Sequence, residues 1–201
     1  MRKTLILALA IATATAAHAA TDPALDKVLR QLDASSAKFQ SAEADLKWDF
    51  YERVVRDTTT QTGSIYFLRS GGNTEMGAAI LTPSKKFVHF ANGKGEFYDV
   101  AAKKATPIDA GANRNKVESF LALGFGGSGK DIEKSWNVTL QGNETIDGVP
   151  TAKLDLVPKD QATADTFKHV TIWIDPVRDI PLKQISYAPE GDTNTTTYTN
   201  C

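Results

Sequence analysis

Residues 43–54 read EADLKWDFYERV, and apolar and charged side chains alternate along this stretch. The apolar set is Ala44, Leu46, Trp48, Phe50 and Val54. The intervening charged set is Glu43, Asp45, Lys47, Asp49 and Arg53. Successive side chains of a β-strand point to opposite faces, so this period of two predicts one long strand over residues 42–55. One buried face and one solvent-exposed face are typical of a strand in an antiparallel sheet.

The alternation continues along the rest of the chain. After a turn expected at residues 58–60, Ile65 and Phe67 resume the pattern. Further strands are expected at residues 75–81, 87–91, 96–100, 137–145, 149–157, 169–175, 182–187 and 193–199. The turn pairs between them are Asn92-Gly93, Asp147-Gly148 and Asp175-Pro176. Because strand follows strand directly, the sequence predicts a mainly β (α+β) protein with an antiparallel sheet of about ten strands.

Two helical regions accompany the strands. Asp22 is predicted to cap a helix that begins at Pro23. Its apolar face is Leu25, Val28, Leu29, Leu32 and Phe39. The second region spans residues 113–136 and begins with the capping pair Asn115 and Glu118. Its apolar face is Val117, Phe120, Leu121 and Leu123, and a short helix with the sequence KDIEKSW follows at residues 130–136.

The glycine run GFGGSGK at residues 124–130 matches G-x-G-x-x-G and most of G-x-x-x-x-G-K-[ST], two nucleotide-binding patterns. Both patterns need a buried strand before the loop and a helix after it. Here the run lies between two short helical segments, and Asp131 would bring a carboxylate towards a phosphate. We therefore expect no nucleotide, and predict a hinge between the helices, because glycine tolerates positive φ. The hinge residues are Gly124, Gly126, Gly127 and Gly129.

The chain begins with the features of a secretory signal peptide. Arg2 and Lys3 are basic, residues 5–11 are apolar, and Ala17-His18-Ala19 forms a small-x-small cleavage site. The apolar run is too short to span a membrane. We therefore expect removal of residues 1–19 and a single soluble domain over residues 20–201 in the periplasm.

Charge and cysteine content exclude other classes of protein. Without Arg2 and Lys3, 21 of the 23 basic residues remain, and the 24 acidic residues then give a net charge of −3. Nucleic-acid binding needs clustered excess positive charge, so no nucleic acid is expected. The single cysteine, Cys201, cannot form an internal disulfide.

No catalytic or metal-binding pattern is evident. His89 and His169 lie in predicted strands without Cys, Asp or Glu at ligand spacing, so no metal and no cofactor are expected. There is no G-x-S-x-G nucleophile elbow, and Ser128 in the glycine run does not follow a strand. We predict no catalytic residues and no enzymatic activity, with a hydrolase assembled from distant residues as an open alternative.

The apolar side of the predicted sheet is the candidate site. A long antiparallel sheet curls and tends to close, so this side is concave. This concave side is either packed as a core or left open as a cavity. The periodicity of the sequence does not distinguish between these two alternatives. With two residues of the second helical region, the candidate cavity residues are Leu46, Trp48, Phe50, Ile65, Phe67, Met76, Ile80, Phe87, Phe97, Phe120, Leu121, Leu154, Ile172 and Ile174.

Four segments carry a resemblance to a known family. They read GSIYFLR at residues 63–69, FANGKGEFY at 90–98, DGVPTAKLDLVPKD at 147–160 and HVTIWIDPVRDIPLKQISY at 169–187. In this order, with the opening helix and the helical insertion, the chain resembles the LolA-type outer-membrane lipoprotein carriers over nearly all of the mature sequence.

The resemblance implies an incomplete antiparallel β-barrel whose apolar concave face is covered by helices that act as a lid. It implies a monomeric carrier that binds the acyl chains of lipoproteins, or another lipid, and needs no nucleotide. The family receives its cargo from an inner-membrane ATP-driven exporter and passes it to an outer-membrane acceptor. Two other functions remain open: an envelope protein-interaction module with a filled core, and a lipid or cell-wall hydrolase.

Arg69 matches a position where the family keeps an arginine that bonds lid-helix carbonyls, so the resemblance implies a lid latch. Alternation places it on the side of Ile65 and Phe67, although an arginine leaning into solvent is the alternative. Two departures are present. Ser70 follows where the family usually has proline, and the chain ends at Cys201 where the family usually extends, so a missing C-terminal extension is one expectation.

Overall fold

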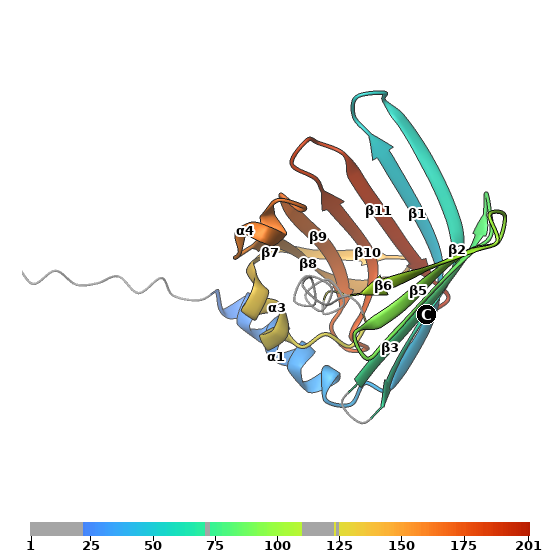
Figure 1. Ribbon diagram of the computed structural model, residues 1–201. Helices are drawn as coiled ribbons and strands as arrows, with labels where there is room; N and C mark the ends of the chain where they lie inside the picture. Colours follow the sequence, from blue (N-terminus) through green and yellow to red (C-terminus); the bar gives the residue numbers. More distant parts are fainter. Residues whose placement is uncertain (1–21, 71–72, 110–122, 124) are drawn as a thin grey trace, which may run out of the picture.

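The computed structural model describes residues 22–70, 73–109, 123 and 125–201 (Figure 1). The predicted signal peptide lies outside these residues, and so does nearly all of the predicted helix at 117–123. Among the candidate site residues, Phe120, Leu121 and Gly124 also lie outside the described residues.

The described residues form one antiparallel sheet of eleven strands. Its first six strands are β1 (Ser41–Glu52), β2 (Asp57–Ser70), β3 (Asn73–Thr82), β4 (Lys86–Ala91), β5 (Lys94–Asp99) and β6 (Lys104–Asp109). The other five are β7 (Trp136–Ile146), β8 (Val149–Pro158), β9 (His169–Asp175), β10 (Ile180–Tyr187) and β11 (Thr193–Thr199).

The sheet curls without closing. Its strand order is β6-β5-β4-β3-β2-β1-β11-β10-β9-β8-β7, so β6 and β7 are its edges and β1 and β11 join the two halves. Figure 1 shows these strands curving round a concave side on which α1 and α3 lie. The predicted fold class, an incomplete antiparallel β-barrel with helices, is confirmed.

The β1–β2 hairpin corrects one expected turn. Residues 58–60 were expected to turn, but Thr58, Thr59 and Thr60 lie in β2 opposite residues 49–51 of β1. The turn comes earlier, where Arg56 has a φ of +56° and its N–H donates to Glu52 O at 2.8 Å. Val54, expected on the apolar face, lies in this turn and is 84% exposed. Threonine is β-branched and favours strands, which explains the longer pairing.

The other hairpins follow the local sequence. Asn92 and Gly93 both have positive φ between β4 and β5, as do Asp147 and Gly148 between β7 and β8. Positive φ at both central residues defines the type I′ turn, which matches the twist of paired strands. Strand β6, which was not expected, pairs with β5 and extends that edge of the sheet.

Three helices lie among the described residues: α1 (Pro23–Ser36), α3 (Gly129–Ser135) and α4 (Gln161–Ala164). Asp22 caps α1 as predicted, because its side chain accepts from the N–H of Ala24. Ser128 caps α3 by accepting from the N–H of Asp131. Helices α1 and α3, with residues 125–128, are called the helical cover below.

Two apolar clusters of described residues lie between the cover and the sheet. The first lies beneath α1 and α3 over β7–β9 and contains Leu25, Leu29, Leu32, Leu123, Ile132, Trp136, Ala152, Leu154, Leu156, Val170, Ile172 and Ile174. The second lies over β1, β2, β3, β10 and β11 and contains Ala44, Leu46, Phe67, Ile80, Phe125, Ile180 and Tyr198. Leu25, Leu29 and Leu32 supply the apolar stripe of α1, as the helical spacing predicted.

Candidate functional site: the concave face and its fastening

Most predicted cavity residues share the concave face but fall into separate environments. Leu154, Ile172 and Ile174 are buried in the first cluster. Leu46, Phe67 and Ile80 belong to the second cluster, with Ile65 and Met76 packed against it. The sheet therefore brings these residues to one face, where helical and aromatic side chains cover them.

Trp48 and Phe50 lie farther along β1 and line an open groove. Its volume is about 290 Å³, and its other lining residues are Thr59, Gln61 and Asn194. Trp48 is 38% exposed, and its Nε1–H donates to Asn194 Oδ1 at 3.1 Å. The groove thus combines two aromatic rings with uncharged polar groups at the end of β1 away from the second cluster.

Phe87 was predicted on the concave face and lies on the opposite one. Residues directly opposite each other in an antiparallel pair share a face. Phe87 is opposite Tyr98 and Ala79, whereas Phe90 is opposite Met76, which faces the second cluster. Phe87 is 43% exposed and Phe90 only 7%. Strand β4 has aromatic residues on both faces, so alternation alone could not choose between them.

Phe97 is half-buried on the concave face, because it lies opposite Val88, two positions from Phe90. It belongs to neither cluster.

Phe125 is a central residue that the sequence analysis missed. Its ring stacks on Phe67 with centroids 4.7 Å apart and meets Tyr198 edge-on at 5.2 Å. It therefore fills the second cluster from the cover side. Phe125 stands within the glycine run, where no periodicity marks it as apolar core, and Tyr198 lies in a threonine-rich strand.

Arg69, at the end of β2, contacts two parts of the helical cover. Its Nη1 donates to the carbonyl of Ser36, the last residue of α1, at 2.8 Å. Its Nη2 donates to the carbonyl of Gly126 at 2.6 Å. The guanidinium also lies 5.5 Å from the ring centroid of Phe39. A planar guanidinium holds its donors in a fixed fork, so one side chain can donate both to the carbonyl at the end of α1 and to that of Gly126.

Gly126 is the point where these contacts converge. Besides Arg69, its carbonyl accepts from Ser36 Oγ at 2.7 Å, and its N–H donates to Asp179 O at 3.0 Å. Its φ is +79°, and a Cβ there would overlap the ring of Phe39. Glycine therefore suits both the backbone conformation and the close packing here.

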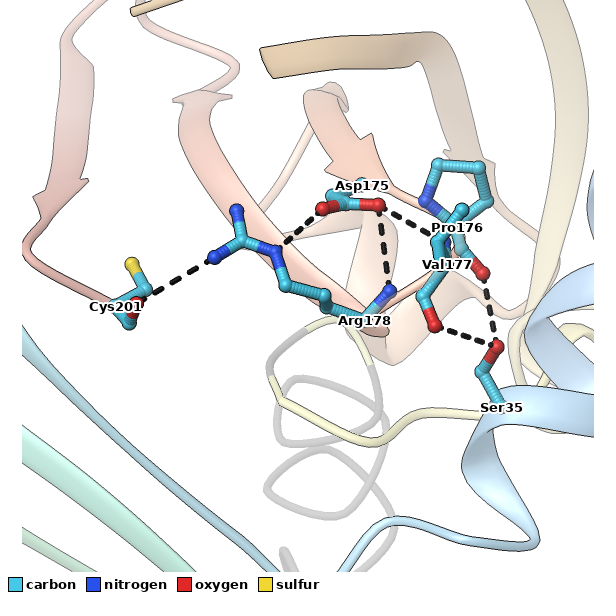
Figure 2. A network of polar contacts seen from close by, with 6 residues as sticks. All are labelled: Ser35, Asp175, Pro176, Val177, Arg178 and Cys201. Atoms are coloured by element: carbon cyan, nitrogen blue, oxygen red, sulfur yellow. Dashed lines mark hydrogen bonds and ion pairs between the residues drawn. The ribbon is translucent and has the colours of Figure 1, made fainter.

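The end of α1 is also tied to the β9–β10 turn (Figure 2). Ser35 Oγ lies 3.0 Å from Pro176 O and 3.1 Å from Val177 O, the two carbonyls it can donate to. Within the turn, Asp175 accepts from Arg178 Nε at 2.6 Å and from the N–H of Val177 at 2.9 Å. Figure 2 shows this network running from Ser35 through the turn to the C-terminal residue. The turn therefore ties the end of α1 to the sheet.

Asp179, in the same turn, has a buried carboxyl group. The residue is 0% exposed, and both carboxyl oxygens lack a hydrogen-bond partner among the described residues. Burial raises the pKa of Asp179 to about 7, while the positive charge of Arg69 acts in the lowering direction. No sequence pattern marks Asp179 as buried, since an aspartate in a turn is expected to face solvent.

The glycine run has a structural explanation that does not involve phosphate. A Cβ at Gly129 would overlap the backbone carbonyl of Leu29, so this glycine allows α3 to approach α1 closely. The N–H of Lys130 donates to Asp33 Oδ1 at 3.0 Å, and that of Asp131 to Ser128 Oγ at 3.1 Å. Protein oxygens thus occupy amides that a phosphate would need. Gly127 is buried, and the hinge role of these glycines stays a prediction.

The two histidines lie away from the concave face. His169 Nδ1 is 2.7 Å from Asp155 Oδ1, and His89 Nε2 is 3.1 Å from Glu75 Oε1. Asp155 lies opposite Thr171, one position from the concave pair Leu154 and Ile172, so the His169 pair is on the convex side.

Within the described residues, no group of three or more His, Cys, Asp or Glu could hold a metal ion. None of the helices in this part of the chain is long and apolar enough to cross a membrane.

A scan against protein-family models finds no match, and no curated protein matches the sequence. Solved structures do match. A chain of the Pseudomonas aeruginosa MucA/MucB complex is 16% identical, with 88% of this chain covering 56% of that one and a TM-score of 0.52. An uncharacterized conserved protein from Thermus thermophilus is 10% identical, with 88% and 85% covered and a TM-score of 0.53.

The LolA superfamily is represented among the solved structures too. A LolA superfamily protein from Nitrosomonas europaea is 12% identical, with 88% of this chain and 91% of that chain covered and a TM-score of 0.38. At such identities, the two matches with TM-scores of 0.52 and 0.53 show a likeness of fold alone.

Proposed function

We propose that the protein is a periplasmic carrier that binds the acyl chains of a lipoprotein, or of another lipid, between its concave sheet and its helical cover. The observation that carries the proposal is the double hydrogen bond of Arg69 to Ser36 and Gly126. These bonds fasten residues 125–128 and the end of α1 over the second cluster, whereas α1 itself packs on the first cluster. Such contacts can be broken without unfolding the sheet.

The concave face has the chemistry for an acyl chain. Each methylene removed from water contributes roughly 0.8 kcal/mol, so a chain gains by replacing Phe125 over Leu46 and Phe67. In this closed form Phe125 occupies that place, and loading therefore requires residues 125–128 to move. The groove at Trp48 and Phe50 is already open and is the proposed entry.

The remaining parts of the proposal follow from the LolA-type resemblance. The carrier is a monomer of one domain, residues 20–201, without enzymatic activity. It accepts cargo from an inner-membrane ATP-driven exporter and delivers it to an outer-membrane acceptor. The location of the His169–Asp155 pair on the convex side supports a carrier over a hydrolase acting at the groove.

Titration with a long-chain fluorescent fatty acid tests the proposal. We expect saturable binding by the wild-type protein and weaker binding by Trp48→Ala, because this change removes an aromatic wall of the groove. Tyr98→Ala is the matched control, since Tyr98 is an exposed aromatic residue on the convex face. Absence of probe binding, or equal loss in both variants, would contradict the proposed site.

A second candidate is an envelope protein-interaction module with a filled core. The occupation of the second cluster by Phe125 favours it, and one structural neighbour is a MucA/MucB complex. This function requires no acyl chain, so a folded protein that refuses the probe would favour the module.

A further inference from the structure

The β3–β4 and β5–β6 connections each bring two adjacent lysines to the same end of the sheet. The first pair is Lys85 and Lys86, and the second is Lys103 and Lys104. The two connections lie side by side, because the N–H of Val100 donates to Lys85 O at 3.2 Å. Lys85, Lys103 and Lys104 are exposed, and Lys86 is half-buried. These four lysines are called the lysine rim below.

The positive charge of the rim is not neutralised within the described residues. None of the four lysines forms an ion pair there. Asp99, which stands between two of them in the sheet, accepts instead from the N–H of Ala102 at 2.9 Å. Residues 81–87 and 98–105 thus hold four lysines and one acidic residue, a net charge of +3. The chain without its predicted signal peptide has a net charge of −3, so this end of the sheet differs in sign from the protein as a whole.

The backbone conformation of Lys103 supports a role for the rim beyond closing a turn. Its φ is +50°, in the left-handed region that lysine adopts rarely. Glycine or asparagine adopts this region at a lower cost. The folding of the turn therefore gives no reason for a lysine at this position, and outliers of this kind cluster at functional sites.

Two exposed apolar side chains lie next to the rim. Leu81 lies in the β-bulge near the end of β3 and is 49% exposed. Phe87 directly follows Lys86 and is 43% exposed. Bulky apolar side chains beside lysines combine burial of apolar area with electrostatic attraction, the combination that binds proteins to the interface of anionic membranes.

The rim lies at the end of the sheet where the groove opens. Thr82, the last residue of β3, is directly opposite Thr62 of β2. Gln61, the next residue towards the β1–β2 turn, lines the groove and is opposite Trp48. A surface bound by the rim would therefore lie close to the groove that is the proposed entry.

We propose that the lysine rim binds the surface of an anionic lipid bilayer and brings the groove beside the membrane. The inference rests on the proposed carrier function for its purpose, since it names the surface with which acyl chains are exchanged. The ammonium groups contact lipid phosphates, and Leu81 and Phe87 enter the headgroup region. Lysine is depleted in protein–protein interfaces, where arginine is enriched, so the rim fits a lipid surface better than an acidic protein.

Sedimentation with sucrose-loaded vesicles tests the proposal on the full protein. One set of vesicles contains phosphatidylglycerol and phosphatidylcholine in equal parts, and the other contains phosphatidylcholine alone. We expect at least about tenfold stronger partitioning onto the anionic vesicles. The preference should fall as salt rises from about 0.05 M to about 0.5 M, because the Debye length shortens.

Replacing Lys103 and Lys104 together with glutamine should lower partitioning onto anionic vesicles by roughly 20-fold, since each lysine near such a surface contributes about fivefold. Arginine at both positions keeps the charge and should retain binding. The matched control is Lys27→Gln with Lys94→Gln, the same charge change at exposed positions on α1 and at the other end of β5, and should stay within about twofold of wild type. Phe87→Ala should lower binding at every salt concentration, because its contribution is apolar.

Equal partitioning onto both kinds of vesicle, or a double glutamine variant of the rim that binds like its control, would overturn the proposal. Absence of binding to anionic vesicles would overturn it too, and would leave an acidic protein as the partner of the rim. The readout does not require an acyl chain in the groove. A protein that docks through the rim but refuses the fatty acid probe would refute the carrier function alone. A protein that takes the probe but ignores anionic vesicles would refute this inference alone.

Discussion

The guanidinium of Arg69 and the carbonyl of Gly126 meet at 2.6 Å, and this contact joins the end of β2 to the segment that carries Phe125. Phe125 in turn stacks on Phe67, two residues before Arg69 on the same strand. A polar bond and an aromatic contact therefore hold the same segment against the same strand. Any movement of this segment away from β2 breaks both contacts.

Replacing Arg69 with leucine should loosen the cover. The change removes two charge-assisted hydrogen bonds, each worth about 1.5–3 kcal/mol, so we expect the free energy of unfolding to fall by roughly 2–3 kcal/mol. Urea denaturation measures this, and Arg69→Lys should be intermediate because an ammonium lacks the planar fork. The Arg69→Leu variant should also retain acyl binding while its transfer of cargo to an acceptor membrane is impaired. Unchanged stability and transfer would refute the latch.

Phe125→Ala should lower the free energy of unfolding and also leave an empty volume in the second cluster. Phenylalanine-to-alanine changes in a core typically cost about 3–5 kcal/mol, and Phe125 is 2% exposed. We expect a fall of about that size in urea denaturation, with tighter binding of a fluorescent fatty acid in the vacated volume. Tyr98→Ala on the convex face is the control. A loss below about 1 kcal/mol would show that Phe125 is not part of the core.

Gly129→Ala should destabilise the packing of α3 on α1. The added methyl group would overlap the carbonyl of Leu29, which is backbone and cannot rotate away. Overpacking of this kind typically costs about 1–3 kcal/mol, measurable as a lower thermal midpoint. Lys134→Ala, an exposed change in the same helix, should leave the midpoint nearly unaltered. Equal midpoints for both variants would argue against close packing.

Asp179→Asn should change how stability depends on pH. The pKa of Asp179 is raised in the folded state to about 7, so the folded protein holds this proton more tightly than the unfolded chain. The contribution of Asp179 to stability therefore falls as pH rises from about 4 to about 7 and levels off above. The variant lacks this loss, so its advantage over wild type should grow by roughly 2–4 kcal/mol across that range. Parallel stability curves across it would contradict the raised pKa.

The fold could be predicted from the sequence because the period of two is local. The alternation in residues 43–54 and the turn pairs Asn92-Gly93 and Asp147-Gly148 specify strands and hairpins without knowledge of distant residues. Errors arose where the local signal allowed two outcomes. Phe87 and Phe90 lie on opposite faces of one short strand, and only the pairing with β3 decides which is buried.

The site was less accessible from the sequence, since its contacts join distant segments. Arg69 was identified by resemblance, but its acceptors lie 33 and 57 residues away along the chain. Phe125 is surrounded by glycines, and Asp179 lies in a polar turn. Both are buried because separate parts of the chain meet around Gly126, which no local pattern encodes.

Native mass spectrometry of the protein purified from its own envelope tests the central claim most directly. The account predicts co-purifying acyl lipid or acylated protein, released on mild unfolding. A protein that is empty from its own envelope and also refuses fluorescent fatty acids would contradict the claim that the concave face carries acyl chains.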